Sequence, residues 1–220
     1  RMKEEGISAK FINGLRVTDE KSIRIVEEIL DQHVNPRIVE LIREFGGDAV
    51  GFSGMQVFHA RKLAVQTLPT GELVDIGFVG EAVQVDVQAI REVVQQEKVP
   101  VISPIGSDPG GAILNINADL AAASLARELK ATKLMYVSDV PGILRNKTDP
   151  ESLLPSVTAL QTEELITRGV IDGGMIPKVR SATEALADGV EKVHFIAGSL
   201  QHGLLLEIFT NAGVGTEILP

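Results

Sequence analysis

The strongest chemical signal in the sequence is the run Gly173-Gly174-Met175-Ile176-Pro177-Lys178. Two glycines let backbone N–H groups come close to an anion, and a proline fixes the first turn of a following helix. Lys178 then lies in that turn, next to the positive end of the helix dipole, where a cation is favourable only beside a bound anion. The run therefore predicts a phosphate site, and the alternative is a solvated lysine after an ordinary turn.

A second candidate site is Asn115-Ile116-Asn117-Ala118-Asp119, between a glycine-rich loop and an apolar helix. Asn117 can be an N-cap, and Asp119 can be a first-turn carboxylate that offsets the helix dipole. Asn115 alternates with Asn117 on a stretch that should be half buried, where paired amides suit recognition of a carboxylate or an amide. Both interpretations are compatible with the sequence.

A third candidate is Arg16, which directly precedes the helix that begins at Thr18-Asp19-Glu20. Its guanidinium group can offer two parallel N–H donors to a carboxylate. A surface ion pair with Asp19 or Glu20 is the simpler alternative.

Helix and strand patterns alternate along the chain, which predicts a layered α/β fold with a mostly parallel open sheet. In such sheets ligands bind where strands pass into helices, and the site signals lie at such points. Helices are expected at about 18–30, 35–45, 87–96, 118–130, 162–169, 174–189 and 204–210, with Thr18, Asn35 and Thr162 as caps. Strands are expected at about 49–52, 63–66, 74–79, 99–102, 133–137, 193–197 and 216–219, with a hairpin through Pro69-Thr70-Gly71.

Composition limits the possible classes of function. The 220 residues carry a net charge of -9, which argues against a nucleic-acid partner and gives no case for an anionic membrane. The sequence has no cysteine, its four histidines fall at no metal-ligand spacing, and neither a signal peptide nor a membrane-length apolar run is found. A cytoplasmic setting is therefore expected. Residues Arg1 to Gly6 look like the interior of a helix, so we expect that the chain has lost an N-terminal piece.

The sequence contains neither G-x-x-x-x-G-K-[ST] nor a G-x-G-x-x-G after a strand, the two standard nucleotide-binding motifs. Instead, motifs in register along essentially the whole chain resemble the amino-acid kinase family, and within it the branch that phosphorylates N-acetyl-L-glutamate. The segments that carry this resemblance are Asn13–Asp19 (NGLRVTD), Gly80-Glu81 (GE), Pro100–Gly106 (PVISPIG), Asn115–Asp119 (NINAD), Ser138–Leu144 (SDVPGIL) and Gly173–Val179 (GGMIPKV). Several motifs in one order are far more specific than any single motif.

The resemblance implies a three-layer α/β/α sandwich like that of carbamate kinase. It implies ATP-dependent phosphorylation of the side-chain carboxylate of N-acetyl-L-glutamate to N-acetyl-L-glutamyl 5-phosphate in arginine biosynthesis, with Mg²⁺ accompanying ATP. Residues 1–220 would form a single domain, with a substrate-binding lobe at about 1–103 and a nucleotide-binding lobe at about 104–220. A homo-oligomer, either a dimer or a hexamer of dimers, is also implied.

Carried over by position, the resemblance gives each candidate residue a role. Arg16, Asn115 and Asn117 would bind the substrate, Lys178 would neutralise the transferred phosphoryl group, and Asp119 would orient the lysines. The nucleotide would lie beside Asp139, Val140, Gly142, Ile143, Leu144, Ile171 and Asp172. Phosphoryl transfer depends mainly on positioning and charge neutralisation, which residues of these types can supply.

The C-terminal segment Val193–Thr216 resembles the arginine-inhibited, hexameric branch of the family. This similarity implies an arginine effector site that includes His194, Glu207 and Gly213. Without the resemblance, Glu207 is interpreted as an exposed carboxylate on a helix.

The sequence also departs from the family pattern. The family's first strand and its histidine-and-glycine phosphate loop are missing, and Gly54-Met55-Gln56 stands where a lysine and an aspartate are common. Ala197-Gly198-Ser199 replaces a usual Asp-Gly-Arg. The alternatives are another member of this fold, acting on glutamate, aspartate, carbamate or a nucleotide, and a non-catalytic arginine-sensing or partner-binding module. The presence of Arg16, Asp119 and Lys178 favours a working enzyme.

Overall fold

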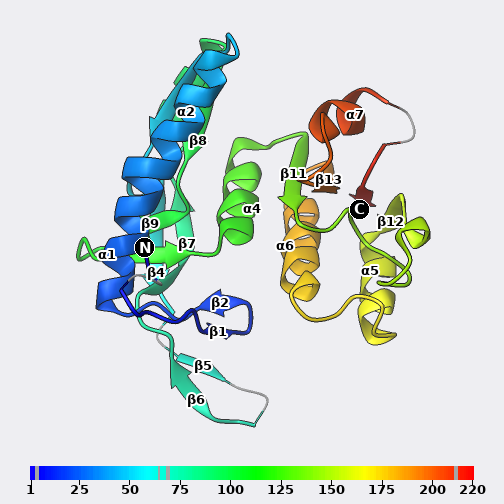
Figure 1. Cartoon of the computed structure of the whole chain (residues 1–220), viewed down its shortest axis with the longest axis horizontal. Coiled ribbons are helices and arrows are strands. Elements are labelled where there is room, and N and C mark those ends of the chain that lie inside the picture. Colours follow the sequence, from blue (N-terminus) through cyan, green and yellow to red (C-terminus); the bar gives the residue numbers. More distant parts are fainter. Residues whose placement is uncertain (3–4, 64, 68–69, 211–212) are drawn as a thin grey trace. The chain divides into compact units, whose positions relative to one another are not determined.

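The computed structural model describes residues 1–2, 5–63, 65–67, 70–210 and 213–220 (Figure 1). They form two compact units, Arg1–Ala121 and Ala122–Pro220, and the division lies inside helix α4 (Ala118–Leu129). Both units combine helices with strands, so the predicted α/β class is confirmed. Among the described residues, no helix combines the length and the apolar character that a bilayer crossing requires.

The first unit ends later than the lobe boundary expected near residue 103. The reason is strand pairing, since β9 (Ile105–Ser107) and β10 (Ile113–Ile116) complete a closed barrel with strands that come earlier in the chain. β10 pairs parallel with β7 (Val79–Val85) and antiparallel with β9, and β7 pairs antiparallel with β4 (Phe58–Lys62). Because β10 leads directly into α4, this barrel fixes the position at which the segment 115–119 leaves the sheet.

Several strands of the first unit were not predicted, namely the four of the barrel and the pair β1 (Phe11–Ile12) and β2 (Leu15–Arg16). The expected hairpin is confirmed as the antiparallel pair β5 (Val65–Thr67) and β6 (Leu73–Asp75). Its predicted turn residue Pro69 lies outside the described residues, as do Lys3 and Glu4 of the expected N-terminal helix. The described neighbours Met2, Glu5 and Gly6 lie in turns.

The long helical run of the first unit is continuous where two helices were expected. It consists of α1 (Glu20–Glu27), the π-helix η1 (Glu28–Val34) and α2 (Asn35–Glu44). The N-cap of α1 is Asp19 and not the predicted Thr18, because the Asp19 side chain accepts a hydrogen bond of 2.7 Å from the Ser22 N–H group, whereas the Thr18 hydroxyl donates to the Arg16 carbonyl.

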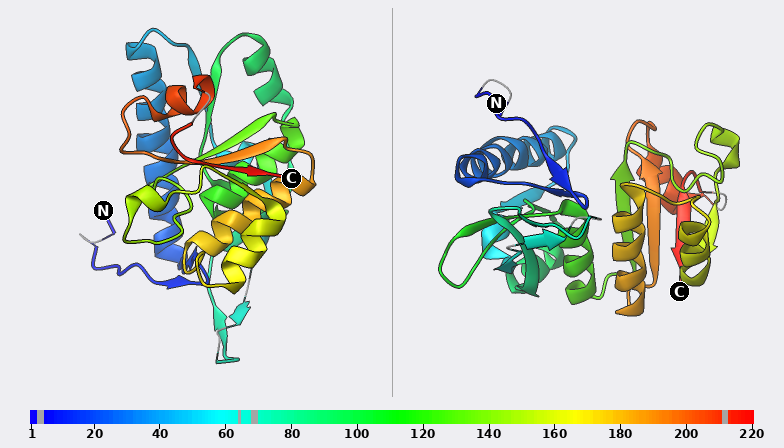
Figure 2. Two further views of the ribbon diagram at one scale, coloured as in Figure 1. Left: turned by 90° about the vertical axis from the view of Figure 1, so that its right-hand side faces the viewer. Right: turned by 90° about the horizontal axis from the view of Figure 1, so that it is seen from below.

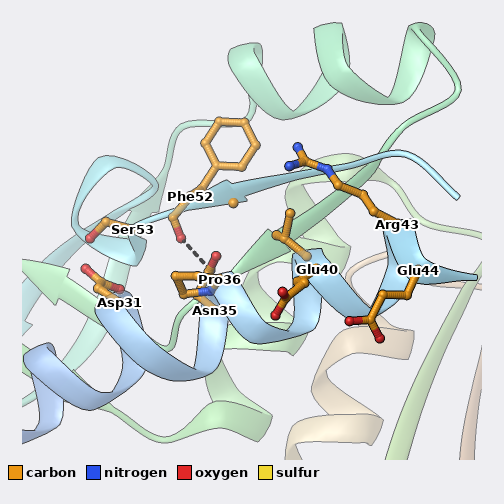
Figure 3. Close-up of a pocket in the computed structure, with 10 residues that line it drawn as sticks. Asp31, Asn35, Pro36, Glu40, Arg43, Glu44, Phe52 and Ser53 are labelled. Carbon is orange, nitrogen blue, oxygen red and sulfur yellow. Dashed lines mark hydrogen bonds between the residues drawn. The ribbon is translucent and has the colours of Figure 1, made fainter.

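The prediction that Asn35 caps the second helix is wrong. The Asn35 amide is buried and donates hydrogen bonds of 3.1 Å to the Phe52 carbonyl and 2.9 Å to the Val101 carbonyl. These carbonyls belong to the parallel strands β3 (Ala49–Phe52) and β8 (Val99–Ile102). Asn35 therefore fastens the helix to this strand pair, on the wall of a groove of about 550 Å³ that contains none of the predicted site residues (Figure 3).

The second unit is built on a four-stranded sheet with the order β11-β13-β14-β12. β11 pairs parallel with β13, β12 pairs parallel with β14, and β13 pairs antiparallel with β14. Helices α5 and α6 cover one face of this sheet, and α7 lies on the other (Figure 2). The elements are β11 (Lys133–Ser138), β12 (Ser156–Thr158), α5 (Ala159–Thr167), α6 (Met175–Ala187), β13 (Lys192–Ala197), α7 (Gly203–Phe209) and β14 (Thr216–Leu219).

One cap in this unit was misplaced by the sequence analysis. Helix α5 begins earlier than predicted, with Thr158 as N-cap in a reciprocal capping box with Gln161. Thr162 is buried inside the helix, where its hydroxyl donates to the Ala159 carbonyl. The predicted start of α6 at the glycine-rich run is confirmed. The remaining helix of the chain, α3 (Gln88–Gln95), and the 3-10 turns η2 (Gly54–Gln56) and η3 (Pro150–Ser152) complete the described elements.

Candidate functional site

The second unit contains a cavity of about 400 Å³ at one end of β11. All seven residues expected beside a nucleotide line it, together with Lys178. The full lining consists of Ser138, Asp139, Val140, Gly142, Ile143, Leu144, Lys147, Val170, Ile171, Asp172, Gly174, Met175 and Lys178. Two stretches that are separated in the sequence, 138–147 and 170–178, therefore meet at one site.

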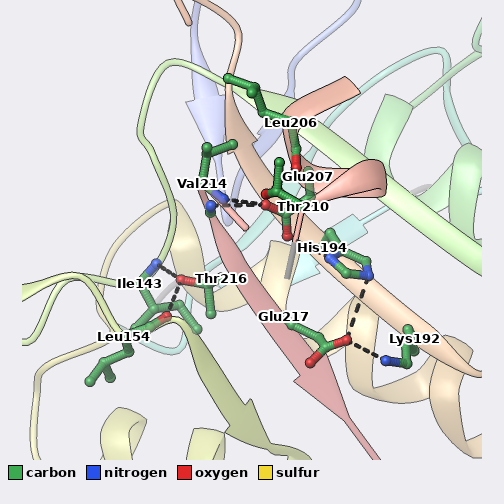
Figure 4. Close-up of polar contacts among 11 residues, drawn as sticks. Ile143, Leu154, Lys192, His194, Leu206, Glu207, Thr210, Val214, Thr216 and Glu217 are labelled. Atoms are coloured by element: carbon green, nitrogen blue, oxygen red, sulfur yellow. Dashed lines mark hydrogen bonds and ion pairs between the residues drawn. The ribbon is translucent and has the colours of Figure 1, made fainter. Parts of the chain in front are cut away.

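The loop after β11 is held in place by a threonine that the sequence analysis did not single out. Thr216 is fully buried, and its hydroxyl accepts a 2.8 Å hydrogen bond from the Ile143 N–H group (Figure 4). The same hydroxyl donates to the Leu154 carbonyl at 2.7 Å. Gly142 has a φ of +152°, and a Cβ atom there would lie 2.4 Å from the Thr216 hydroxyl oxygen. Only glycine permits this approach, so Thr216 sets the shape of this cavity wall.

The opposite wall is the beginning of α6. Gly173 has a φ of +53°, and Gly174 is the residue at which the helix begins. Lys178 lies in the first turns of α6 and is half buried. The helix N-terminus and the ammonium group carry charge of the same sign, which makes this wall a suitable site for an anion. The apolar side chains of the cavity, such as Ile143 and Met175, offer a surface for a flat, uncharged group.

Lys147 is a charged residue of the cavity lining that the sequence analysis did not predict. Its ammonium group donates a hydrogen bond to the carboxylate of Asp172, and both side chains are about half exposed. The sequence gives no local signal for this pair, because Lys147 and Asp172 belong to different loops and meet only in the folded unit.

In the first unit, Arg16 and Asn115 lie together and line two neighbouring hollows of about 390 Å³ and 210 Å³. The Asn115 amide donates to the Thr18 hydroxyl at 3.2 Å, and it is half exposed, as its place on β10 predicts. Asn117 lines the smaller hollow. The structure thus brings the three expected substrate-binding residues into one region of this unit.

The surface ion pair considered for Arg16 is not what the structure shows. Its guanidinium group lies 5.0 Å from the centre of the Phe11 ring and within 3.4 Å of the Met2 sulfur. Asp19 caps α1, and Glu20 pairs with Arg24. Stacking on an aromatic ring orients a guanidinium group through its flat face and leaves in-plane N–H donors that can bind a carboxylate.

Asn117 is also the N-cap of α4, as the simpler interpretation predicted. Its side-chain oxygen accepts hydrogen bonds from the N–H groups of Asp119 and Leu120, at 2.9 and 3.2 Å. The cap uses the side-chain oxygen and not the NH₂ group, and Asn117 also lines the smaller hollow, so the two interpretations are compatible. Asp119 lies in the first turn of α4, where its charge complements the helix dipole.

His194, Glu207 and Gly213 form a third group in the second unit. Figure 4 shows the His194 and Glu207 side chains of this group. Glu207 is buried and not exposed as its helical setting suggested. One carboxylate oxygen lies 2.7 Å from His194 Nδ1, and the other accepts hydrogen bonds of 2.6 and 3.0 Å from the Val214 and Gly215 N–H groups. Glu207 therefore ties α7 to β13 and to the segment before β14.

Two further charges surround this histidine. Glu217 lies 3.9 Å from His194 Nε2 and accepts a 2.7 Å hydrogen bond from Lys192. Among the described residues, His194 Nε2 is the buried side-chain nitrogen or oxygen that has no hydrogen-bond partner. At Gly213, where φ is +64°, a Cβ atom would lie 2.9 Å from the Glu207 carboxylate.

The pKa of Glu207 lies below its ordinary value near 4.5. Burial raises the pKa, but the hydrogen bonds from Val214 and Gly215 and the neighbouring His194 together outweigh burial. The ionised form of Glu207 thus belongs to the folded state. Within the described part of the chain, no group of three His, Asp or Glu side chains has the geometry to hold a metal ion.

Comparison with known proteins identifies relatives along nearly the whole chain. The family model described as the amino acid kinase family matches residues 1–197. An acetylglutamate kinase from Akkermansia muciniphila is 47% identical over 219 residues, which cover 99% of this chain and 73% of that protein. An acetylglutamate kinase from Carboxydothermus hydrogenoformans is 49% identical over 218 residues, which cover 97% of this chain and 74% of that protein.

Among solved structures, the N-acetylglutamate synthase from Neisseria gonorrhoeae in complex with coenzyme A and N-acetyl-glutamate has a TM-score of 0.85 and 26% identity. The similarity covers 99% of this chain but 48% of the synthase. A second structure of that synthase, in complex with coenzyme A and L-arginine, has a TM-score of 0.76 at the same 26% identity, covering 99% of this chain and 50% of the synthase.

The lowered pKa of Glu207 predicts an acid-sensitive contribution to stability. A carboxylate whose pKa is depressed on folding stabilises the folded state above its unfolded pKa, and this contribution disappears as the pH falls through the folded pKa. We expect Glu207→Gln to be about 1–3 kcal/mol less stable than wild type at neutral pH, with the difference shrinking below about pH 4. The free energy of unfolding, measured by denaturant titration from neutral to acid pH, checks this. The exposed Glu191→Gln is the matched control, and parallel curves for both variants would contradict the assignment.

Proposed function

The chain belongs to the amino acid kinase family, and from this premise we propose that it transfers a phosphoryl group from ATP to the side-chain carboxylate of N-acetyl-L-glutamate. This reaction is a step of arginine biosynthesis. The observation that carries the proposal is the cavity of the second unit, whose lining contains all seven expected nucleotide residues and Lys178. The similarity to acetylglutamate kinases from two distant bacteria supports the choice of substrate.

Different walls of this cavity bind different parts of the nucleotide. Ile143, Leu144 and Met175 provide apolar surface for the base, and Asp139 provides an acceptor for hydroxyl groups. The beginning of α6 attracts phosphate oxygens through the positive end of its helix dipole and the Lys178 ammonium group. ATP arrives with Mg²⁺ bound to its phosphates, so the metal enters as part of the substrate and needs no resident group of protein ligands.

The acceptor binds in the first unit beside Arg16 and Asn115. Its α-carboxylate takes the paired donors of the Arg16 guanidinium group, and the Asn115 and Asn117 amides contact the same end of the molecule. None of these groups reacts, so their contribution is to binding and orientation.

In the reaction, an oxygen of the substrate's side-chain carboxylate attacks the γ-phosphorus of ATP. The bond between this phosphorus and the bridging oxygen breaks, and the electron pair leaves with ADP, so that an acyl phosphate is formed. The Lys178 ammonium group stabilises the charge on the transferred group. Asp119 is assigned to the orientation of lysine side chains, a role that depends on charge and not on proton transfer.

The finer parts of the proposal concern regulation, assembly and location. We assign L-arginine as an inhibitor that binds at His194, Glu207 and Gly213, a view supported by the likeness to a synthase solved with L-arginine. The guanidinium group of the ligand pairs with the carboxylates of Glu207 and Glu217, in exchange for their contacts with His194 and Lys192. The protein works in the cytoplasm, where ATP is available, and as a homo-oligomer.

The substrate assignment predicts selective turnover of one acceptor. Acyl phosphate trapped with hydroxylamine should form rapidly with N-acetyl-L-glutamate and ATP, and at least about a hundredfold more slowly with glutamate, aspartate or carbamate. An acceptor that lacks the acetyl group leaves polar groups of the site unpaired, which is the physical reason for the difference. Faster turnover of one of the other acceptors would identify that acceptor as the substrate. Arginine binding without turnover of any acceptor would favour a sensing module.

Two substitutions should separate transition-state stabilisation from substrate binding. Lys178→Ala should lower kcat by about a hundredfold or more, because it removes a cation from the transferred phosphoryl group. Arg16→Ala should raise KM for N-acetyl-L-glutamate by about tenfold or more and leave kcat nearly unchanged, because the α-carboxylate does not react. Steady-state kinetics with both substrates varied gives the two constants.

Arg180→Ala and Arg24→Ala are the matched controls, because both side chains are exposed cations. Arg180 lies on α6, as Lys178 does, and Arg24 lies on α1, the helix that follows Arg16. Each should change kcat and KM by less than about twofold. A Lys178→Ala enzyme with a kcat near that of wild type would remove Lys178 from the mechanism.

Arginine binding should depend on the charge of Glu207. L-Arginine should raise the melting temperature of wild type by several degrees, whereas L-citrulline, which has the same shape without the charge, should not. In Glu207→Gln the shift caused by arginine should largely disappear, and in Glu191→Gln it should persist. Each variant is compared with its own ligand-free melting temperature. An equal arginine shift in all three proteins would place the effector elsewhere or exclude it.

A further inference from the structure

Thr18 occupies an unusual position between the two residues assigned to the acceptor. It is fully buried, directly before the N-cap of α1. Its N–H group donates to the Ile76 carbonyl at 2.9 Å, and its carbonyl accepts a 2.6 Å hydrogen bond from the Phe78 N–H group. The neighbouring Gly77 has a φ of +76°, and a Cβ atom there would lie 2.1 Å from the Thr18 carbonyl oxygen. The backbone of Thr18 is therefore fixed from both sides.

The Thr18 hydroxyl joins Arg16 to Asn115. It donates its proton to the Arg16 carbonyl at 2.8 Å, and it accepts a hydrogen bond of 3.2 Å from the Asn115 side-chain nitrogen. A hydroxyl has one proton, and here that proton is committed to a carbonyl, which can only accept. The Asn115 group that faces Thr18 must then be the NH₂ group and not the oxygen.

This directionality has a consequence for ligand binding. An asparagine amide has two possible orientations that differ little in shape, and the hydrogen bonds around it decide which one is populated. With one N–H bond directed to Thr18, Asn115 keeps its second N–H bond and its oxygen for a ligand in the hollows that it shares with Arg16. Without the hydroxyl, the Asn115 amide could adopt either orientation, and one of the two would present the wrong group to the ligand.

We propose that Thr18 is a positioning residue for acceptor binding, whose hydroxyl orients the Asn115 amide and holds the Arg16 backbone beside it. The proposal rests on the proposed function for the identity of the acceptor, an N-acylated amino acid with a free carboxylate. It extends that function, because Thr18 acts through Asn115 and Arg16 and makes no contact with the reacting atoms.

The test compares Thr18→Val, which keeps the shape and loses the hydroxyl, with Thr18→Ser, which keeps the hydroxyl. Thr18→Val should raise KM for N-acetyl-L-glutamate by about tenfold, with KM for ATP and kcat within about twofold of wild type. Thr18→Ser should restore KM to within about twofold. Thr67→Val, on an exposed strand of the same unit, is the control and should change nothing.

A double-mutant cycle distinguishes positioning from a general loss of structure. In an Asn115→Ala background the hydroxyl has no amide to orient, so Thr18→Val should add little further change in KM. Additive effects of the two substitutions, or a lowered melting temperature with an unchanged KM, would overturn the proposal. If Thr18→Val does not fold, Thr18→Ala is measured with the same expectation.

A second readout separates this proposal from the proposed function. If wild type does not phosphorylate N-acetyl-L-glutamate, the proposed function fails, whereas the orientation of Asn115 can still be measured. In NMR spectra of wild type and Thr18→Ser, one side-chain amide proton of Asn115 should be protected from exchange with water. The protection should be lost in Thr18→Val, and its persistence there would refute the role of Thr18.

Discussion

A buried threonine hydroxyl that both donates and accepts holds the ligand-facing segments in each unit. In the first unit Thr18 accepts from the Asn115 amide and donates to the Arg16 carbonyl. In the second unit Thr216 accepts from the Ile143 N–H group and donates to the Leu154 carbonyl. Both threonines are fully buried, where an unmade hydrogen bond is most costly, so neither connection can be exchanged for water without a loss of stability.

The charges beside the candidate sites differ from the net charge of the whole chain. The net charge of -9 would repel a nucleotide at long range, and the cavity lining itself holds two lysines and two aspartates, with Lys147 paired to Asp172. The positive features that suit a phosphate are therefore Lys178 and the beginning of α6, which act within a Debye length, about 8 Å at physiological ionic strength. The opposite arrangement holds at Glu207, where N–H groups and His194 stabilise a buried anion.

The sequence was sufficient for features that depend on neighbouring residues. The start of α6 at its glycine-rich run and the strand from Lys133 follow from local spacing. The residues of the cavity lining were implied by the family resemblance, and the cap of α1 was expected one residue too early. The barrel was not predictable in the same way, because three of its strands have five residues or fewer and β10 pairs with β7 across a long intervening segment. In the longer strand β7, buried and exposed residues do not alternate, so the pattern by which a strand is recognised is missing.

Asparagine shows why local patterns leave roles undecided. Asn117 caps a helix, Asn35 bridges two strand carbonyls, and Asn115 is held by a hydroxyl beside a hollow, although each was expected near the beginning of a helix. The side chain can donate and accept in each setting, so the partner decides its role, and that partner can be nearly a hundred residues away. Glu207 follows the same logic, since amides and a histidine contributed by other elements turn an ordinary helix carboxylate into a buried link. A ligand that competes for Glu207 must therefore also alter how α7 is attached to β13.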